Sequence, residues 1–214
     1  MNFKYYKSHY LIIFILVCLV IGDQMSHGIE EWLKDRPTLA RINWLTHSFS
    51  TLSIIVLAIL FVNKIGWKWP FFRWLVDIPN LNGRYEGKII SSYKKDGQQE
   101  NTEKPCVIEI KQNASFIHVQ AYFEDPKTAQ DTSKSHSISE EIVKEKSGFY
   151  SLHYIFLSES DVLQIELNNH GGTAKLNYYP DKKRLEGSYY NQRNNFGKII
   201  VSFNSSKRLG RFKK

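Results

Sequence analysis

The feature that most constrains this chain is an uncharged apolar run, Trp44–Val62, whose nineteen residues read WLTHSFSTLSIIVLAILFV. A helix of that length extends about 28 Å at roughly 1.5 Å per residue, which is close to the hydrocarbon thickness of a bilayer. The run therefore predicts a transmembrane helix over residues 44–62.

A second apolar run, Leu11–Ile21, has only eleven residues, which fits a secretory signal core as well as a membrane span. The residues that follow it, GDQMSHG, lack the small-x-small pattern of a cleavage site. Tyr5, Tyr6 and Tyr10 can form an interfacial aromatic belt, and with them the helix runs from about residue 6 to residue 25. We predict a second span there, and a cleaved signal or a partly inserted segment is the alternative.

Positive charges flank both runs, and their count favours a cytoplasmic amino terminus by a small margin. With two spans, both ends of the chain then face the cytoplasm. The dense aromatic segment GWKWPFFRW after the second run predicts an interfacial anchor. We expect three parts: a transmembrane region over 1–79, a cytoplasmic β-domain over 80–206 and a basic tail over 207–214.

From Leu81 onward, apolar and polar residues alternate with a period of two, which is typical of strands with one buried face. Turn residues bound each run, and only Ile138–Lys146 is ambiguous between helix and strand. We predict eight or nine antiparallel strands in meander order, including VLQIELN at 162–168, closing into an up-and-down, lipocalin-like barrel. A β-sandwich is the alternative fold. Gly87 and Gly187 fall at inward positions, where they fit tight barrel bends.

Motifs of known catalytic chemistry are absent from the sequence. It has no P-loop, no GxSxG, no HExxH and no CxxC pair, and its histidines show no metal-ligand spacing. Glu109, Glu166 and Glu186 fall on the outward side of their strands, and Cys18 and Cys106 lie in unrelated segments. We therefore predict no enzyme activity, no catalytic residue, no metal site, no cofactor and no disulfide.

Aromatic and polar side chains share the inward parity of the predicted strands, and they are Tyr85, Ser91, Tyr93, Tyr154, Tyr189 and Asn191. Arg193 continues the parity of the last two. Aromatic faces stack on bases and an arginine fork pairs with phosphate oxygens, so the set predicts a nucleotide-like ligand in the barrel. The alternative is that the tyrosines only fill the barrel and Arg193 belongs to a turn.

Five segments, IPNLNGRYEG, SKSHS, SLHYIF, HGGTAKL and LEGSYYNQRNNFGKI, follow the two apolar runs in this order. In this arrangement the chain resembles the two-span, β-strand-rich effectors of bacterial CBASS antiphage systems, which are CD-NTase-associated membrane proteins with a minimal lipocalin-like barrel. The most specific motif is LxGxYYxxRxxxG, here Leu185 to Gly197 with Arg193. Where the family often has two threonines, this chain has Asn191 and Asn195.

The resemblance implies an antiphage function at the bacterial inner membrane. A cyclic dinucleotide made by a partner nucleotidyltransferase would enter the cytoplasmic barrel, and binding would drive the helices to self-associate, breach the membrane and kill the cell. It adds Ser137, within SKSHS, to the ligand-binding set, and it implies no DNA or RNA polymer as a partner. Two other classes remain open: a membrane-tethered carrier of an apolar ligand, and a scaffold that binds a protein through its outer face.

Overall fold

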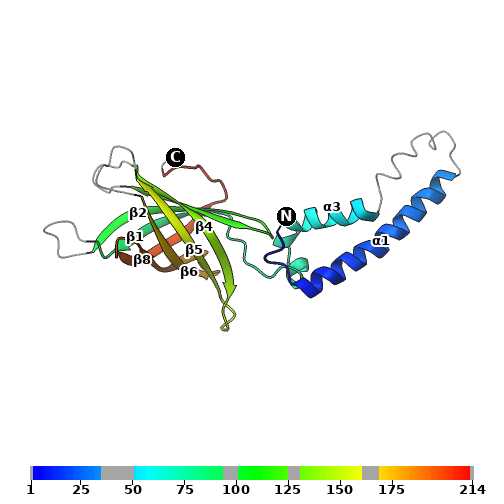
Figure 1. Ribbon diagram of the computed structural model, residues 1–214, viewed down its shortest axis with the longest axis horizontal. Coiled ribbons are helices and arrows are strands. Elements are labelled where there is room, and N and C mark those ends of the chain that lie inside the picture. Colours follow the sequence, from blue (N-terminus) through cyan, green and yellow to red (C-terminus); the bar gives the residue numbers. More distant parts are fainter. Residues whose placement is uncertain (1, 35–50, 94–100, 125–130, 161–168, 213–214) are drawn as a thin grey trace. The chain divides into compact units, whose positions relative to one another are not determined.

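The computed structural model describes residues 2–34, 51–93, 101–124, 131–160 and 169–212 (Figure 1). These residues divide into a helical unit, Met1–Ile78 with Asn113–Phe116, and a barrel unit, Pro79–Gln112 with Ile117–Lys214. Residues 44–50 of the predicted span and the predicted strand at 162–168 lie outside the described residues.

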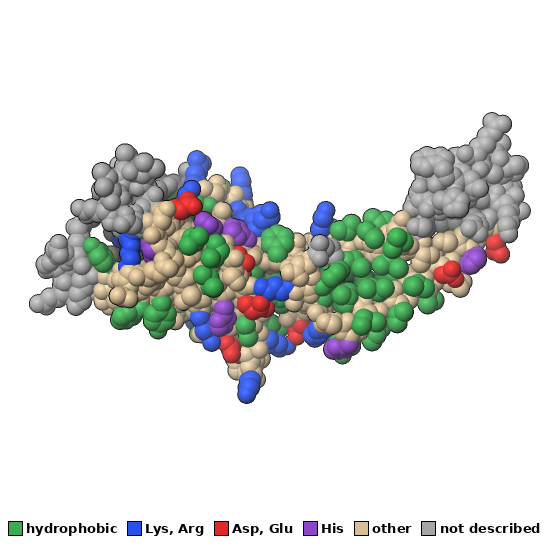
Figure 2. All heavy atoms as spheres, in the orientation of Figure 1, with side chains coloured by type: hydrophobic (Ala, Val, Ile, Leu, Met, Phe, Trp, Pro, Cys, Tyr) green, Lys and Arg blue, Asp and Glu red, His purple; other side chains and the backbone are tan. Residues whose placement is uncertain are grey.

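The helical unit contains two α-helices, α1 over Ser8–Lys34 and α3 over Thr51–Lys64. In α1, Ser8–Gly28 is long and apolar enough to cross a membrane, whereas the fourteen residues of α3 fall short of that length. On the face drawn in Figure 2, hydrophobic side chains cover much of both helices. The helices approach closely at Gly22, where an added Cβ would lie 2.9 Å from Cγ2 of Thr51. The two expected helices are present, and α1 is the one of clear membrane length.

Two short 3-10 helices follow, η2 over Gly66–Lys68 and η3 over Pro70–Trp74. Within this aromatic segment Trp67 is buried, whereas Trp69 and Phe71 are 50% and 71% exposed. Exposed rings of this kind suit the interfacial anchor expected here.

The barrel unit is a closed barrel of eight antiparallel strands in the order β1 to β8, which confirms the barrel prediction over the sandwich (Figure 1). Ile138–Lys146, the ambiguous stretch, falls largely within a strand, β4. The strand bounds are β1 Gly83–Ser91, β2 Thr102–Gln112, β3 Ile117–Glu124, β4 Asp131–Lys144, β5 Tyr150–Ser160, β6 His170–Tyr179, β7 Arg184–Asn191 and β8 Phe196–Ser205.

The two ends of the barrel differ in what they carry. At one end, here called the linker end, the chain enters β1 through Pro79–Asn82 and leaves β8 toward its C-terminal segment. At the other, the loop end, β1, β3, β5 and β7 end and β2, β4, β6 and β8 begin. Toward the linker end the interior is packed with side chains that are nearly or fully buried: Tyr85, Ile108, Ile110, Leu152, Leu176, Leu185 and Val201.

Gly87 and Gly187 lie at inward positions, as expected, and both allow a close approach of neighbouring backbone. A Cβ added at Gly87 would collide with the carbonyl oxygen of Ile200, and one added at Gly187 with that of Lys175. Only glycine fits at such bends, which help a sheet to close on itself.

Candidate functional site

Strand register aligns three of the expected ligand residues across the barrel wall. Tyr154 on β5 pairs with Ala174, Ala174 with Tyr189, Tyr189 with Gly197, and Gly197 with Ser91 on β1. We call these five residues the first interior row. Small residues alternate with the two tyrosines along the row, and the Tyr189 ring packs over Gly197.

A second interior row lies next to the first, toward the loop end on β5 to β7. It runs from Ser137 on β4 through Phe156 and Gly172 to Asn191 on β7. The ring centroids of Tyr154 and Phe156 lie 6.2 Å apart. Five of the eight expected ligand residues therefore occupy two neighbouring rows of the interior, together with Phe156, which the sequence analysis left out of the set.

Both tyrosines of the first interior row are held by their surroundings. Tyr189 is 5% exposed, its ring lies against Gly197, and its hydroxyl is hydrogen-bonded to Ser91. Burial raises the pKa of Tyr189, and it raises that of Tyr154 as well. Burial also raises the pKa of the nearby Cys106 thiol to about 12. These groups therefore stay neutral at physiological pH and offer hydrogen bonds and ring faces rather than charge.

Ser137 lies where the β3–β4 ladder ends. Its hydroxyl oxygen accepts a hydrogen bond from the Val119 N–H (2.8 Å) and donates one to a carboxylate oxygen of Glu140. Nδ1 of His118 lies 3.2 Å from the same hydroxyl and 3.4 Å from that carboxylate oxygen. In this arrangement Ser137 replaces a missing ladder bond, so it joins β3 to β4 as well as facing the second interior row.

Arg193 lies in the β7–β8 turn at the loop end. Asn191 builds this turn, because its side-chain oxygen accepts hydrogen bonds from the N–H groups of Arg193 (3.1 Å) and Asn195 (3.0 Å). Gln192 ties the turn to β6, since Gly171 N–H donates to its side-chain oxygen at 2.8 Å. The arginine is half-buried on a turn that is fixed from both sides.

Two expected residues lie away from the interior rows. Tyr85 is 1% exposed at the linker end and packs edge-on against Phe203, with ring centroids 5.6 Å apart. Tyr93 follows the end of β1 and is 53% exposed, although Thr102 Oγ1 donates to its carbonyl oxygen at 2.6 Å. The geometry thus gives Tyr85 a packing position and Tyr93 a position at the rim.

One cation outside the predicted set, Lys104, faces the interior near the loop end. Lys104 pairs with Ile89, and the alternation along β2 gives it the same parity as the buried Cys106. Extending that alternation two residues before Cys106 would have found it. Lys104 is half-buried, and a lysine at this position can pair with an anionic group on a ligand inside the barrel.

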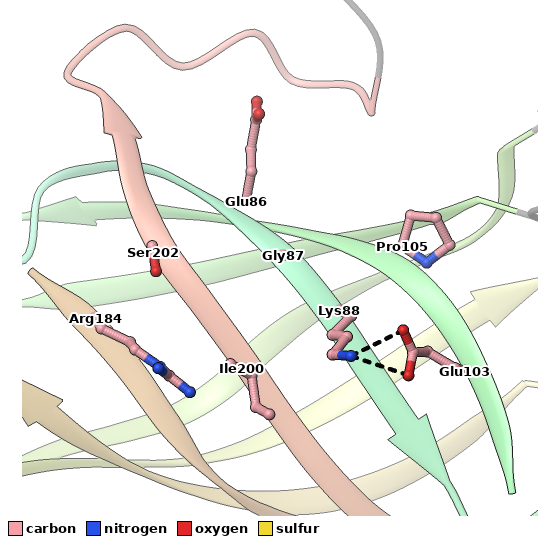
Figure 3. Close-up of a pocket in the computed structure, with 8 residues that line it drawn as sticks. All are labelled: Glu86, Gly87, Lys88, Glu103, Pro105, Arg184, Ile200 and Ser202. Atoms are coloured by element: carbon pink, nitrogen blue, oxygen red, sulfur yellow. Dashed lines mark hydrogen bonds and ion pairs between the residues drawn. The ribbon is translucent and has the colours of Figure 1, made fainter. Parts of the chain in front are cut away.

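A separate groove of about 590 Å³ crosses the outer face of β7, β8, β1 and β2 (Figure 3). Figure 3 shows Lys88 and Glu103 pairing along it, with the Nζ–Oε1 distance 3.0 Å. Its lining includes Glu86, Lys88, Glu103, Arg184, Ile200 and Ser202, and none of the eight expected ligand residues. Among the residues that the structure describes, no group of three or more His, Cys, Asp or Glu side chains lies close enough together to hold a metal.

Comparison with known proteins identifies the family of the barrel domain. The family model described as "Cap15, cyclic dinucleotide receptor domain" matches residues 76–202, which include all eight strands except the last three residues of β8. The matched range also contains every expected ligand residue and Lys104. Among curated proteins, no significant match to the chain was found. The match extends over more than half of the sequence, and the chain belongs to the Cap15 cyclic dinucleotide receptor family of ligand-binding effector domains.

Proposed function

We propose that this protein is a two-span effector of the bacterial inner membrane, whose cytoplasmic barrel senses a cyclic dinucleotide and whose helices then self-associate and disrupt the membrane. Residues 80–206 are the sensor and residues 1–79 the output device. The observation that carries the proposal is the alignment of Ser91, Tyr154 and Tyr189 in one interior row, inside the domain that matches a cyclic dinucleotide receptor.

The two rows offer what a cyclic dinucleotide needs. Its bases have flat faces that stack on aromatic rings, and Tyr154, Tyr189 and Phe156 supply such rings next to Ala174, Gly172 and Gly197. Its two phosphates are anionic, and Lys104 and Arg193 are cations near the loop end. In this reading Ser91, Ser137 and Asn191 contribute hydrogen bonds, and the ligand enters from the loop end.

Isothermal titration of the full chain in nanodiscs with a panel of cyclic dinucleotides tests the sensor. We expect Arg193→Ala and Lys104→Ala each to weaken binding by about 10- to 150-fold, because a hydrogen bond to a charged group contributes about 1.5–3 kcal/mol. Lys88→Ala is the matched control, since Lys88 lies on the outer face in the pair with Glu103. Unchanged affinity in both the Arg193 and the Lys104 variants would contradict the site.

The proposed output requires contacts between helices of different copies, and apolar helices with small residues pack closely in lipid. Deleting residues 1–79 removes both helices and leaves all eight strands. We expect the deleted protein to bind ligand and to lose toxicity in cells that also express the nucleotidyltransferase producing it. Toxicity that survived the deletion would refute membrane disruption. An apolar ligand identified by mass spectrometry of the purified protein would favour a carrier instead.

A further inference from the structure

The C-terminal segment Ser206–Phe212 is tied down on the outside of the barrel by two buried charged side chains. We call this segment the strap. Glu109 accepts hydrogen bonds from the N–H groups of Leu209 (2.7 Å) and Gly210 (3.0 Å). Arg84 donates to the carbonyl oxygens of Arg211 (2.8 Å) and Phe212. The strap therefore has a defined backbone position rather than the freedom of a solvated tail.

We call the ion pair between Arg84 and Glu109 the anchor. It lies on outward-facing positions of β1 and β2, where burial is unexpected. Nη1 of Arg84 lies 2.9 Å from Oε1 of Glu109, and the two residues are 2% and 3% exposed. Burying a charge pair has a high desolvation cost, which is offset here by the four backbone hydrogen bonds that the strap supplies. The pair and the strap thus form one built element.

The strap presents cations and no acidic residue. The side chains of Lys207, Arg208 and Arg211 are exposed, while their backbone is held by the anchor or runs beside it. Lys213 and Lys214 follow in the sequence. Because the backbone is already ordered, bringing these charges against an anionic surface costs less conformational entropy than ordering a flexible tail would.

The anchor also lies close in the chain to the helical unit. Arg84 is the second residue of β1, and it lies six positions after Ile78, the last residue of the helical unit before the barrel. Six residues extend at most about 20 Å. The chain therefore limits the distance between Arg84, which holds the strap, and Ile78 to about 20 Å.

We propose that the strap is a docking site for anionic phospholipid headgroups at the membrane surface. The inference rests on the membrane location given under Proposed function and not on the ligand site. Each cation near an anionic leaflet strengthens binding about fivefold, so three give on the order of 100-fold. The attraction is screened by salt, because the Debye length falls to about 3 Å at 1 M ionic strength.

The test uses the full chain in nanodiscs of phosphatidylcholine, alone or with about one third phosphatidylglycerol. A Ser206→Cys variant carries an environment-sensitive dye, with Cys18→Ala and Cys106→Ala removing the native thiols, and spin-labelled headgroups quench it. We expect at least several-fold stronger quenching with phosphatidylglycerol, lost in high salt and in Lys207→Gln/Arg208→Gln/Arg211→Gln. Incorporation of the protein into nanodiscs reports separately on the membrane location.

The matched control is Lys134→Gln/Lys175→Gln/Lys198→Gln, which removes three lysines from surface pairs elsewhere on the barrel. Those pairs contribute little to stability, so the control should fold and quench like the parent. Equal quenching in the two lipid mixtures would overturn the proposal. An equal loss of quenching in the control would also overturn it, since net charge alone would then explain the effect. A dye that responds to an added oligonucleotide but not to lipid would overturn it as well.

Discussion

The strap makes a quantitative prediction about the two charges beneath it. Removing one member of a buried ion pair leaves the other without its counter-charge and typically costs about 3–5 kcal/mol. Arg84→Met leaves the Glu109 carboxylate with two N–H donors but no cation. Glu109→Leu leaves Arg84 with Glu86, whose Oε1 accepts from Nε at 2.6 Å. Arg84→Met should therefore be the more damaging of the two substitutions.

The expected shift in melting temperature follows from the size of the barrel unit. Unfolding entropy is about 2.1 cal/mol/K per residue. For a domain of roughly 130 residues, the melting temperature therefore falls by about 1 °C for each 0.27 kcal/mol lost from the free energy of unfolding. A cost of about 3–5 kcal/mol then lowers the barrel's transition by about 10–18 °C. Glu109→Leu belongs at the lower end of that range because Glu86 still pairs with the guanidinium.

Calorimetry of the full chain in detergent should compare the two single variants with the double variant Arg84→Met/Glu109→Leu. The double variant separates the loss of the ion pair from the loss of side-chain packing. Exchanging both charges for apolar residues of similar volume is often close to neutral, so we expect the double variant within about 4 °C of the parent. It should nevertheless release the strap to trypsin after Lys207 and Arg208. The idea of a buried coupled pair would be refuted if each single substitution lowered the melting temperature by less than about 3 °C. It would also be refuted if the double variant lowered it by the sum of the two single effects.

Two further outcomes follow from the interior and from the helices. Because burial raises the pKa of Tyr154 and Tyr189 above the ordinary value near 10, their contribution to stability is complete below that pH and is lost above it. Absorbance at 295 nm should therefore show their ionisation only together with alkaline unfolding, and earlier ionisation would contradict the buried row. In α1, Gly22→Ala should weaken the packing of α1 against α3, because its Cβ would crowd Thr51, whereas Gly28→Ala meets no atom within 4 Å and should stabilise the helix by up to about 1 kcal/mol. Equal thermal stabilities of the two variants in detergent would contradict the close approach.

Period-two alternation predicted which residues face the interior, because each strand buries one face. It could not predict which residues share a row. Ser91 and Tyr154 are joined through three intervening strands, and their alignment depends on register that turns and connections set. For the same reason Tyr85 entered the expected set, although it lies at the opposite end of β1 from Ser91.

Lys104 and Glu109 show two other limits of the pattern. Pro105 stands inside β2, where the sequence alone gives little reason to expect a strand, since proline rarely fits inside a sheet. It is tolerated because β2 pairs with β1 at this point while the β2–β3 ladder begins only at Cys106. Glu109 has the outward parity that the sequence predicted, but it is buried by a strap that returns 100 residues later in the chain. Periodicity within a strand contains no information about such a crossing.

β1 connects the candidate site to the helical unit through the linker Pro79–Asn82, whose backbone is held by hydrogen bonds. The last residue of β1 is Ser91, which belongs to the first interior row. The first residue of β1 is Gly83, which directly follows the linker Pro79–Asn82. The side-chain oxygen of Gln112 accepts from Leu81 N–H at 2.8 Å, and its Nε2 donates to the Pro79 carbonyl oxygen at 2.9 Å. Asn82 adds two hydrogen bonds to the Gln112 backbone, of 2.7 and 2.8 Å. The linker is thereby fixed to the end of β2.

This attachment leads to a prediction about signalling. A ligand shifts an equilibrium only by its different affinity for the two states, so the state of the site must be mechanically connected to the helices. Gln112→Ala removes both side-chain bonds to the linker, and we expect it to leave ligand affinity within twofold while reducing toxicity at least tenfold. Gln120→Ala, on the exposed side of β3, is the control and should retain toxicity. If Gln112→Ala is as toxic as the parent at equal expression, a rigid linker is unnecessary, and coupling must pass through another part of the barrel.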